Sequence, residues 1–201
     1  TKNIPDGNTF NVSYQMGFNT NATFRNFQLT DGTAKDYLGF GADVRNLPSS
    51  FPAHLGEHST DEAAAFTRQI NQRWGINKFT AIPDQKISLT SHRSYDVGGW
   101  KIGNITNLNW STEFDYSETV NNNYIAYDVK NDVSRPRFEY NDIRYKNTSK
   151  LGALFNWSFQ RDGSKYELRN FFSQRGVSAL TQREGMNYYS DKDIRKWESL
   201  Y

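Results

Sequence analysis

The stretch LGALFNWSFQRDGSKYELRNFF, Leu151–Phe172, decides the fold class. On both sides of its central RDGSK, large apolar residues alternate with small, polar or charged ones, and only Leu154 interrupts the polar series. The apolar series consists of Ala153, Phe155, Trp157, Phe159, Tyr166, Leu168 and Phe172. Because successive side chains of a β-strand point to opposite faces, the stretch predicts two strands, each with one apolar and one polar face.

A hairpin is predicted between these two strands at Asp162-Gly163. Glycine adopts the positive φ that a tight turn requires, and Asp-Gly between two alternating runs is a strong hairpin signal. The pattern is compatible with half-buried strands of a soluble protein. It is also compatible with transmembrane barrel strands, whose apolar residues face lipid and whose polar residues face a wet lumen.

The composition narrows the class of protein. The chain has 201 residues, of which 36% are hydrophobic and 15% aromatic, and its mean hydropathy is −0.84. Low hydropathy with many aromatic residues suits a barrel with a polar interior, and it also suits a carbohydrate-binding β-protein. The net charge of +2 gives no electrostatic argument for nucleic acid as a partner.

Several other classes are excluded or disfavoured. The absence of cysteine excludes a disulfide scaffold and a thiolate metal site. No run of apolar residues is long enough for a transmembrane helix. The first residues, TKNIPDGNTF, lack a signal-peptide pattern, so either the protein is not exported or its N-terminus has been removed.

Alternation elsewhere predicts an antiparallel up-and-down meander of about six strands. The first is expected from Thr9 into the twenties, with a bulge before Phe27 and Leu29. Further strands are predicted at 87–95, 102–116, 138–145 and from Trp197 to Tyr201, with 87–95 paired to 102–116. Long loops are expected near 31–85, 117–137 and 176–195. This alternation of short and long connections favours a transmembrane barrel, in which short turns alternate with long extracellular loops.

One short helix is predicted inside the first long loop, from Thr60 to Trp74. Ser59 and Glu62 form a capping box at its start, Phe66, Ile70 and Trp74 recur every four residues, and Gly75 is expected to end it.

Three segments resemble TonB-dependent outer-membrane receptors of the Bacteroidota type. They are TKNIPDGNTF, the stretch DYLGFGADVRNLPSSFP from Asp36 to Pro52, and the helix that ends in Arg73-Trp74. Leu151–Tyr201 is also similar to a strand, hairpin and loop of that family. Gly41-Ala42 stands where the family has an acidic residue and a glycine.

The resemblance implies that residues 1–201 are the N-terminal part of a barrel in the bacterial outer membrane. The implied partners are membrane lipid, a plug domain before residue 1, further barrel strands after residue 201 and an inner-membrane TonB-type energy complex. The implied function is active uptake of a scarce nutrient: a ferric siderophore, cobalamin, a peptide or a glycan. No enzymatic activity, cofactor or nucleic acid partner is expected. The alternative is a soluble β-sandwich that binds carbohydrate through exposed aromatic residues.

Loop side chains are the candidates for ligand binding. Arg45, Arg68 and Arg73 lie in the first expected loop, and Arg135 and Arg137 flank a proline in the second. Arginine can hold carboxylate or phosphate groups with two parallel hydrogen bonds, although single loop arginines are usually only solvated. Trp74 is the sixth candidate, and packing of the helix is its commoner role.

Two further patterns are weighed and set aside. His54-Leu55-Gly56-Glu57-His58 matches a zinc-peptidase string, but Gly56 and the nearby Pro52 disfavour the helix that this chemistry needs. Glu113 and Asp115 share a strand face, and paired carboxylates serve glycoside hydrolysis, but a polar ladder explains them better. No catalytic or metal site is therefore predicted.

A sandwich and a barrel differ in what covers the aromatic face. In a barrel this face is exposed, whereas in a sandwich it packs against a second sheet. The barrel interpretation predicts that eight residues face outward and are accessible: Phe10, Val12, Tyr14, Trp110, Phe114, Phe155, Trp157 and Phe159.

Overall fold

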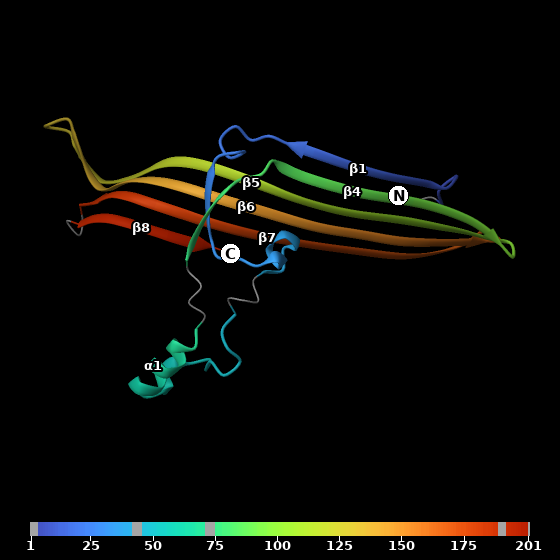
Figure 1. Cartoon of the computed structure of the whole chain (residues 1–201), viewed down its shortest axis with the longest axis horizontal. Helices are drawn as coiled ribbons and strands as arrows, with labels where there is room; N and C mark the ends of the chain where they lie inside the picture. Colours follow the sequence, from blue (N-terminus) through green and yellow to red (C-terminus); the bar gives the residue numbers. More distant parts are fainter. Residues whose placement is uncertain (1–3, 42–45, 71–74, 189–191, 201) are drawn as a thin grey trace.

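One open antiparallel sheet dominates the computed structural model, which describes residues 4–41, 46–70, 75–188 and, for the backbone alone, 192–200. The sheet has six strands in the order β1-β4-β5-β6-β7-β8 (Figure 1). Their bounds are β1 Thr9–Gly17, β4 Asp84–Val97, β5 Trp100–Asp128, β6 Val133–Arg161, β7 Ser164–Asn187 and β8 Lys192–Leu200. Each strand pairs with its neighbours in the chain, apart from the long excursion between β1 and β4. The all-β, up-and-down meander predicted from the alternation is thus confirmed, and the sheet is not closed.

The predicted pairings and tight turns are present. Ile87 lies opposite Trp110 in the β4–β5 pair, and Trp157 lies opposite Leu168 in the β6–β7 pair. Both connections are two-residue turns, Gly98-Gly99 and Asp162-Gly163, and φ is positive at all four residues. Positive φ at both central residues defines the turn whose twist matches that of the flanking strands.

The loops expected near 117–137 and 176–195 are wrong, because these segments are mostly strand. β5 and β6 continue as a pair to a short turn at 129–132, and β7 runs to Asn187 before β8 begins. Ion pairs join the same two strands: Lys146 lies 3.3 Å from Asp115 and Lys150 lies 3.2 Å from Glu113, and within the extension Arg135 lies 3.9 Å from Asp128. The register shifts beside Tyr124, opposite Pro136, which is where a strand tolerates a proline.

A second, two-stranded sheet lies in the first long connection. β2, Asn26–Thr30, pairs with β3, Ile76–Thr80, and we call this unit the ribbon. The expected continuation of the first strand into the twenties is wrong, since β1 ends at Gly17. The chain turns before the ribbon, with positive φ at Phe24, whose N–H donates to the carbonyl of Ala81 at 2.8 Å.

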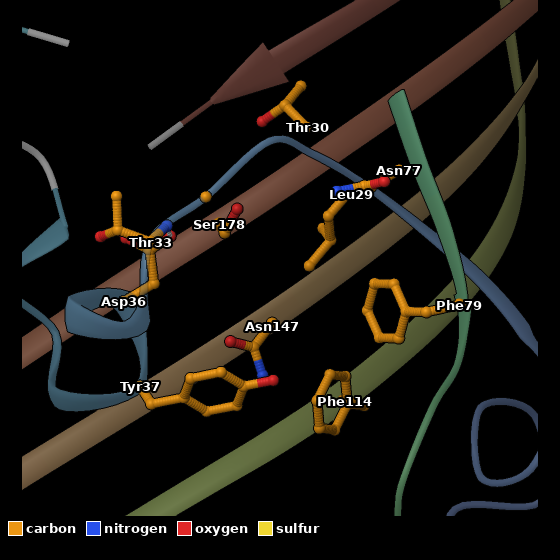
Figure 2. A pocket seen from close by; sticks show the side chains of 11 residues that line it. Leu29, Thr30, Thr33, Asp36, Tyr37, Asn77, Phe79, Phe114, Asn147 and Ser178 are labelled. Atoms are coloured by element: carbon orange, nitrogen blue, oxygen red, sulfur yellow. Dashed lines mark hydrogen bonds between the residues drawn. The ribbon is translucent and has the colours of Figure 1, made fainter. Parts of the chain in front are cut away.

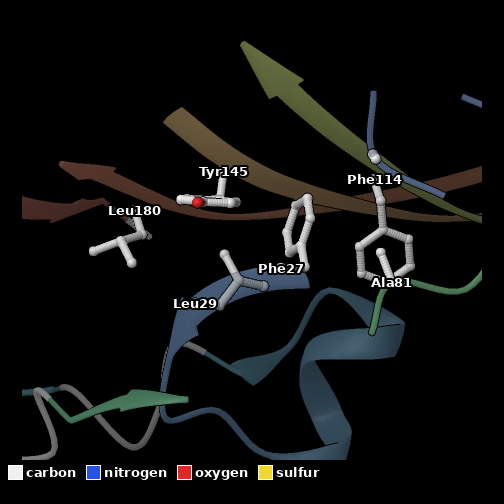
Figure 3. Packing of buried hydrophobic residues seen from close by; sticks show 7 residues of the cluster. Phe27, Leu29, Ala81, Phe114, Tyr145 and Leu180 are labelled. Atoms are coloured by element: carbon white, nitrogen blue, oxygen red, sulfur yellow. The ribbon is translucent and has the colours of Figure 1, made fainter. Parts of the chain in front are cut away.

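The ribbon packs across one face of the main sheet and forms the core with it. Phe27 lies between Phe114 of β5 and Tyr145 of β6, with ring centroids 5.4 and 5.2 Å away (Figure 3). The buried cluster consists of Ala22, Phe27, Leu29, Ala81, Phe114, Tyr145 and Leu180. The long strands therefore have a covered half, where the ribbon lies, and a second half next to the two-residue turns.

The described part of the first connection also contains short helical segments: η1 Ala34–Leu38, η3 Leu55–Glu57 and α1 Thr60–Arg68. The capping box is confirmed, since the Ser59 N–H donates to Glu62 Oε2 at 3.0 Å and the Ser59 hydroxyl accepts from the Glu62 N–H. The expected end at Gly75 is wrong. Ile70 donates to the carbonyl of Thr67, a tight turn that closes the helix early. Among the described residues, none of the helices is long and apolar enough to cross a membrane.

Replacing Ser59 by alanine is expected to destabilise α1 by about 1 kcal/mol, because the N–H of Glu62 loses its acceptor. The pKa of Glu62, held low mainly by the backbone N–H of Ser59 and also by its hydroxyl, should rise in the same variant. Hydrogen exchange of the α1 amides measures the first effect, with Ser49→Ala, an exposed serine outside the helix, as the control. Unchanged exchange in Ser59→Ala would show that the cap does not hold this helix.

Candidate functional site: two sheet faces and a pocket

The two faces of the main sheet differ sharply along neighbouring rows. One row across five strands is apolar: Val12, Leu89, Leu108, Ala153 and Phe172 lie directly opposite one another. The next row, on the other face, is small and polar: Ser13, Ser88, Asn109, Gly152 and Ser173. Residues directly opposite in a sheet share a face, so the pattern extends across the sheet and not only along single strands.

The apolar face is exposed near the two-residue turns. We call this exposed part the apolar band. Its exposed members are Phe10, Val12, Tyr14, Met16, Ile87, Tyr95, Val97, Leu108, Phe155, Tyr166, Leu168 and Phe172. Phe10 is 60% exposed at one side of the sheet, and Leu168 is 56% exposed on β7. Among the described residues, the buried cluster that the ribbon forms with the sheet does not extend into this part of the apolar face.

Four of the eight residues predicted to face outward, Phe10, Val12, Tyr14 and Phe155, are exposed, and three more are half-buried on the same face. Those three are Trp110, Trp157 and Phe159; the rings of Trp157 and Phe159 stack on each other.

Phe114 is the exception. Its prediction is wrong, because the side chain is 3% exposed and lies under the ribbon. Alternation gives the face of a residue but not which part of that face is covered.

The opposite face, which we call the polar face, carries ladders of hydrogen bonds and ion pairs. The Asn107 amide donates to the Thr90 hydroxyl at 2.8 Å, and the Asn109 amide donates to Asn107 Oδ1 at 3.1 Å. Glu113 and Asp115 each have their own lysine, as described above. The two carboxylates are thus separate rungs of a ladder, in agreement with the interpretation preferred from sequence.

Further along the polar face, Arg183 of β7 holds Asp142 of β6. Its Nε and Nη2 each lie 2.7 Å from one carboxylate oxygen, and its guanidinium carbon lies 4.7 Å from the centre of the Tyr140 ring. The hydrogen bonds from Arg183 hold the pKa of Asp142 below its usual value, against partial burial, which acts in the other direction. A two-bond arginine–carboxylate pair fixes the relative position of the two strands.

The chain before β1 also contacts the polar face. A Cβ added to Gly103 would lie 2.9 Å from Pro5 Cδ and 3.0 Å from the side chain of Ile4. The Asn8 side chain accepts from the N–H of Ser94 at 2.8 Å. The residues that lead into the first strand therefore approach from the polar side of the sheet.

The segment DYLGFG, Asp36–Gly41, is docked on the other face. Gly39, with φ of 82°, meets the backbone of Gly176 on β7. Gln174 Nε2 donates to the carbonyl of Gly39, and Trp110 Nε1 donates to the carbonyl of Tyr37, both at 2.6 Å. The side chain of Asp36 accepts from the Thr33 N–H at 2.8 Å. The first six residues of the Asp36–Pro52 stretch thus have a defined place on the sheet.

A pocket of about 260 Å³ lies between this segment, the ribbon and the main sheet. In the view of Figure 2, Thr33, Asp36 and Ser178 lie on one side, and Leu29, Phe79 and Phe114 lie on the other. Tyr37, Asn77 and Asn147 also line it. Sequence analysis did not find this pocket, because its walls come from segments far apart in the chain.

Of the six candidate ligand residues, Arg45, Arg73 and Trp74 lie outside the described residues. Arg68 is exposed at the end of α1, while Arg135 and Arg137 are exposed near the start of β6. Figure 1 shows α1 well separated from the turn between β5 and β6. The structure therefore does not bring Arg68 together with Arg135 and Arg137.

The histidines of the zinc-peptidase string flank η3 and are not on one helix face. His58 lies against Phe66, with ring centroids 5.2 Å apart, and its Nδ1 is 3.9 Å from Glu62. Within the part of the chain that the structure describes, no three acidic or histidine side chains are grouped as metal ligands.

Comparison with protein-family models, with curated proteins and with solved structures gave no match to this chain. Its function is therefore argued from the geometry above and from the sequence resemblance.

Proposed function

We propose that this chain forms part of the wall of a TonB-dependent receptor barrel in the bacterial outer membrane. In this role the apolar band faces lipid, and the polar face lines the route of a scarce nutrient. The nutrient would be a ferric siderophore, cobalamin, a peptide or a glycan. Uptake would depend on a plug domain and on an inner-membrane energy complex. Closure of the barrel would require further strands.

The observation that carries the proposal is the pair of neighbouring rows. An apolar row that crosses five strands, with Val12, Leu108 and Phe172 exposed and Leu89 and Ala153 half-buried, is costly in water. Soluble monomers rarely expose apolar patches of this extent. Transmembrane barrel strands have this arrangement, with apolar residues outside and polar residues inside.

Strand length also supports the proposal. A membrane-crossing strand needs about 9–11 residues, whereas β5 and β6 have 29 residues each. The band occupies one part of these strands, and the ribbon covers the same face beyond it. The contacts of Ile4 and Pro5 with the polar face are consistent with a plug domain on that side.

A soluble sandwich is the second candidate, and the ribbon is the observation in its favour. The ribbon covers Phe114 and Tyr145 as the second sheet of a sandwich would. Its two strands of five residues cover only one half of the face. This candidate would require another unit to cover the apolar band.

Cysteine labelling separates the two candidates, because the chain contains no native cysteine. Val12→Cys places a thiol on the apolar row, and Ser13→Cys places one on the polar row of the same strand. We would express each variant in the native host and treat intact cells and isolated outer membranes with a lipid-soluble and a water-soluble maleimide.

In the outer membrane, Cys at 12 is expected to react preferentially with the lipid-soluble reagent and Cys at 13 with the water-soluble one, by about tenfold in each case, because ionised reagents enter hydrocarbon poorly. Equal labelling of both positions by the water-soluble reagent, or recovery of the protein in a soluble fraction, would refute the barrel.

An uptake assay tests transport itself. Deleting the gene should abolish uptake of one of the four nutrient classes, and removing the energy complex should have the same effect. A membrane location without any loss of uptake would refute the transport function while leaving the barrel intact.

A further inference from the structure

The pocket described above has no cation among the described residues that line it, since none of them is a lysine, arginine or histidine. Its one carboxylate, Asp36, already accepts the Thr33 N–H. A wall without cations and with one carboxylate disfavours phosphate, sulfate and carboxylate ligands.

Several hydrogen-bonding groups of the wall are unused among the described residues. Thr33 Oγ1 is buried and, apart from its capping contact with the backbone of Asp36, has no hydrogen-bond partner among the described residues. Both bonds recorded for the Asn147 side chain use its Nδ2, which donates to Thr112 Oγ1 and to the Glu113 carbonyl, so its Oδ1 remains to accept. The hydroxyl of Ser178 and the amide of Asn77 have no recorded bond in the described part of the chain. Of these groups, Thr33 Oγ1 and the Asn147 side chain are buried, and a buried polar group without a partner calls for an explanation. Ser178 is half-buried and Asn77 is exposed, so both are open to water.

The remaining wall is apolar and largely aromatic. Phe79 of the ribbon and Phe114 of the sheet have ring centroids 6.2 Å apart, with Leu29 beside them. Tyr37, 48% exposed, adds a further aromatic ring to the lining. A ligand in this pocket would therefore meet flat apolar surfaces and, at its rim, neutral donors and acceptors.

We propose that this pocket binds a neutral sugar ring of hexose size. The apolar C–H face of the ring would lie on the aromatic wall, and its hydroxyls would use Thr33, Asn77, Asn147 and Ser178. A pocket of about 260 Å³ is smaller than the usual range for drug-sized ligands, which agrees with a single ring.

The location of the pocket leaves two sources for such a sugar. The pocket lies on the face that carries the apolar band, beside the docked segment whose Phe40 stacks on Phe172. If the apolar band lies in the membrane, the pocket lies close to the membrane surface. The sugar is then either a free molecule or the headgroup of a membrane lipid. Binding of a sugar does not depend on the transport proposal; only the lipid source depends on a membrane location.

Titration calorimetry of the purified protein tests the proposal, in a detergent without a sugar headgroup. The probes are glucose, galactose and mannose, with glucose 6-phosphate as the charged counterpart. Ser178→Leu fills the pocket, and Ser173→Leu places the same side chain on the polar face of the same strand as a matched control.

At least one neutral hexose should bind to the wild type and to Ser173→Leu, and affinity should fall about tenfold or more in Ser178→Leu, because a pocket without free volume excludes the ring. Glucose 6-phosphate should bind more weakly than glucose. Thr33→Val, which keeps the shape of the side chain, should weaken binding several-fold with an unchanged circular dichroism spectrum.

Absence of binding by all three hexoses at millimolar concentration, together with absence of binding to glycolipid, would overturn the proposal. Equal binding by Ser178→Leu and the wild type would overturn it as well.

Flotation with vesicles that contain a hexosyl diacylglycerol, compared with phosphatidylcholine alone, distinguishes the two sources. Binding of free hexose in solution supports a soluble ligand. Selective binding of the glycolipid vesicles without free hexose binding supports a lipid headgroup, provided that Ser178→Leu abolishes the selectivity. Glycolipid binding that Ser178→Leu leaves unchanged would refute this pocket as the site.

Discussion

Replacing Phe27 by alanine should lower the free energy that holds the ribbon on the main sheet by about 4 kcal/mol. Phe27 is fully buried, and its ring lies within 5.6 Å of the ring centres of Phe79, Phe114 and Tyr145. Truncation removes these contacts and leaves a cavity that two relatively rigid sheets cannot close. Phe27 contributes a large share of the contacts that hold the ribbon on the sheet, because the buried cluster is small.

Hydrogen exchange of the β2 and β3 amides would measure the effect. A loss of about 4 kcal/mol corresponds to an increase of about a thousandfold in the exchange of amides that open with the ribbon. Phe171→Ala is the control, since Phe171 is 76% exposed on the polar face and its truncation should change stability by less than about 0.5 kcal/mol. A ribbon that exchanges equally slowly in both variants would show that the cluster is not what anchors it.

The sequence was sufficient to predict the meander because its signal is local. The alternation around Asp162-Gly163 and the Gly98-Gly99 turn each specify a hairpin within a short stretch, and both hairpins are present in the predicted pairing. The capping box at Ser59 is equally local and was also correct. In each case the residues that carry the signal contact one another in the fold.

The errors arise where stability depends on distant partners. Segments 117–128 and 133–137 are rich in asparagine and charged residues, which have low strand propensity, and they form strands because each pairs with the other. The 45 residues of segment 31–75 separate β2 from β3, so no local pattern could predict the ribbon. The burial of Phe114 follows from that missed ribbon.

In the candidate site, too, local features could be predicted from the sequence and contacts between distant segments could not. The stretch from Asp36 to Pro52 resembles a family in its sequence, but the docking of its first residues, Asp36–Gly41, on Gln174 and Gly176 cannot be read from sequence. The pocket is a product of that docking. The arginine candidates rest on the expectation that they lie in loops, whereas Arg135 and Arg137 lie on a strand.

Replacing Gly176 by alanine or valine should undock the Asp36–Gly41 segment. A Cβ at Gly176 would lie 2.6 Å from the Cα of Gly39 and 3.2 Å from its carbonyl carbon, and both are backbone atoms that cannot rotate away. The segment must therefore move off the sheet. It would lose the hydrogen bonds from Gln174 and Trp110 and the stacking of Phe40 on Phe172. We expect a cost of about 3 kcal/mol, the upper end of the range for overpacking.

Whether Gly176→Val stabilises or destabilises the protein distinguishes the contact with Gly39 from the strand propensity of the new residue. Glycine is a poor strand residue and valine a good one, so in an uncovered strand Gly176→Val should stabilise β7 by a fraction of a kcal/mol. Destabilisation can therefore come only from the contact with Gly39. Gly56→Val is the control, because nothing lies within 4 Å of its added Cβ.

Limited proteolysis and hydrogen exchange across residues 34–41 would report the undocking. Faster exchange there, with β7 itself unchanged, is the expected result. Because the docked segment carries Asp36 and Tyr37 to the pocket, hexose binding should be lost in the same variant. Slower exchange in the segment would show that Gly39 and Gly176 are not in contact.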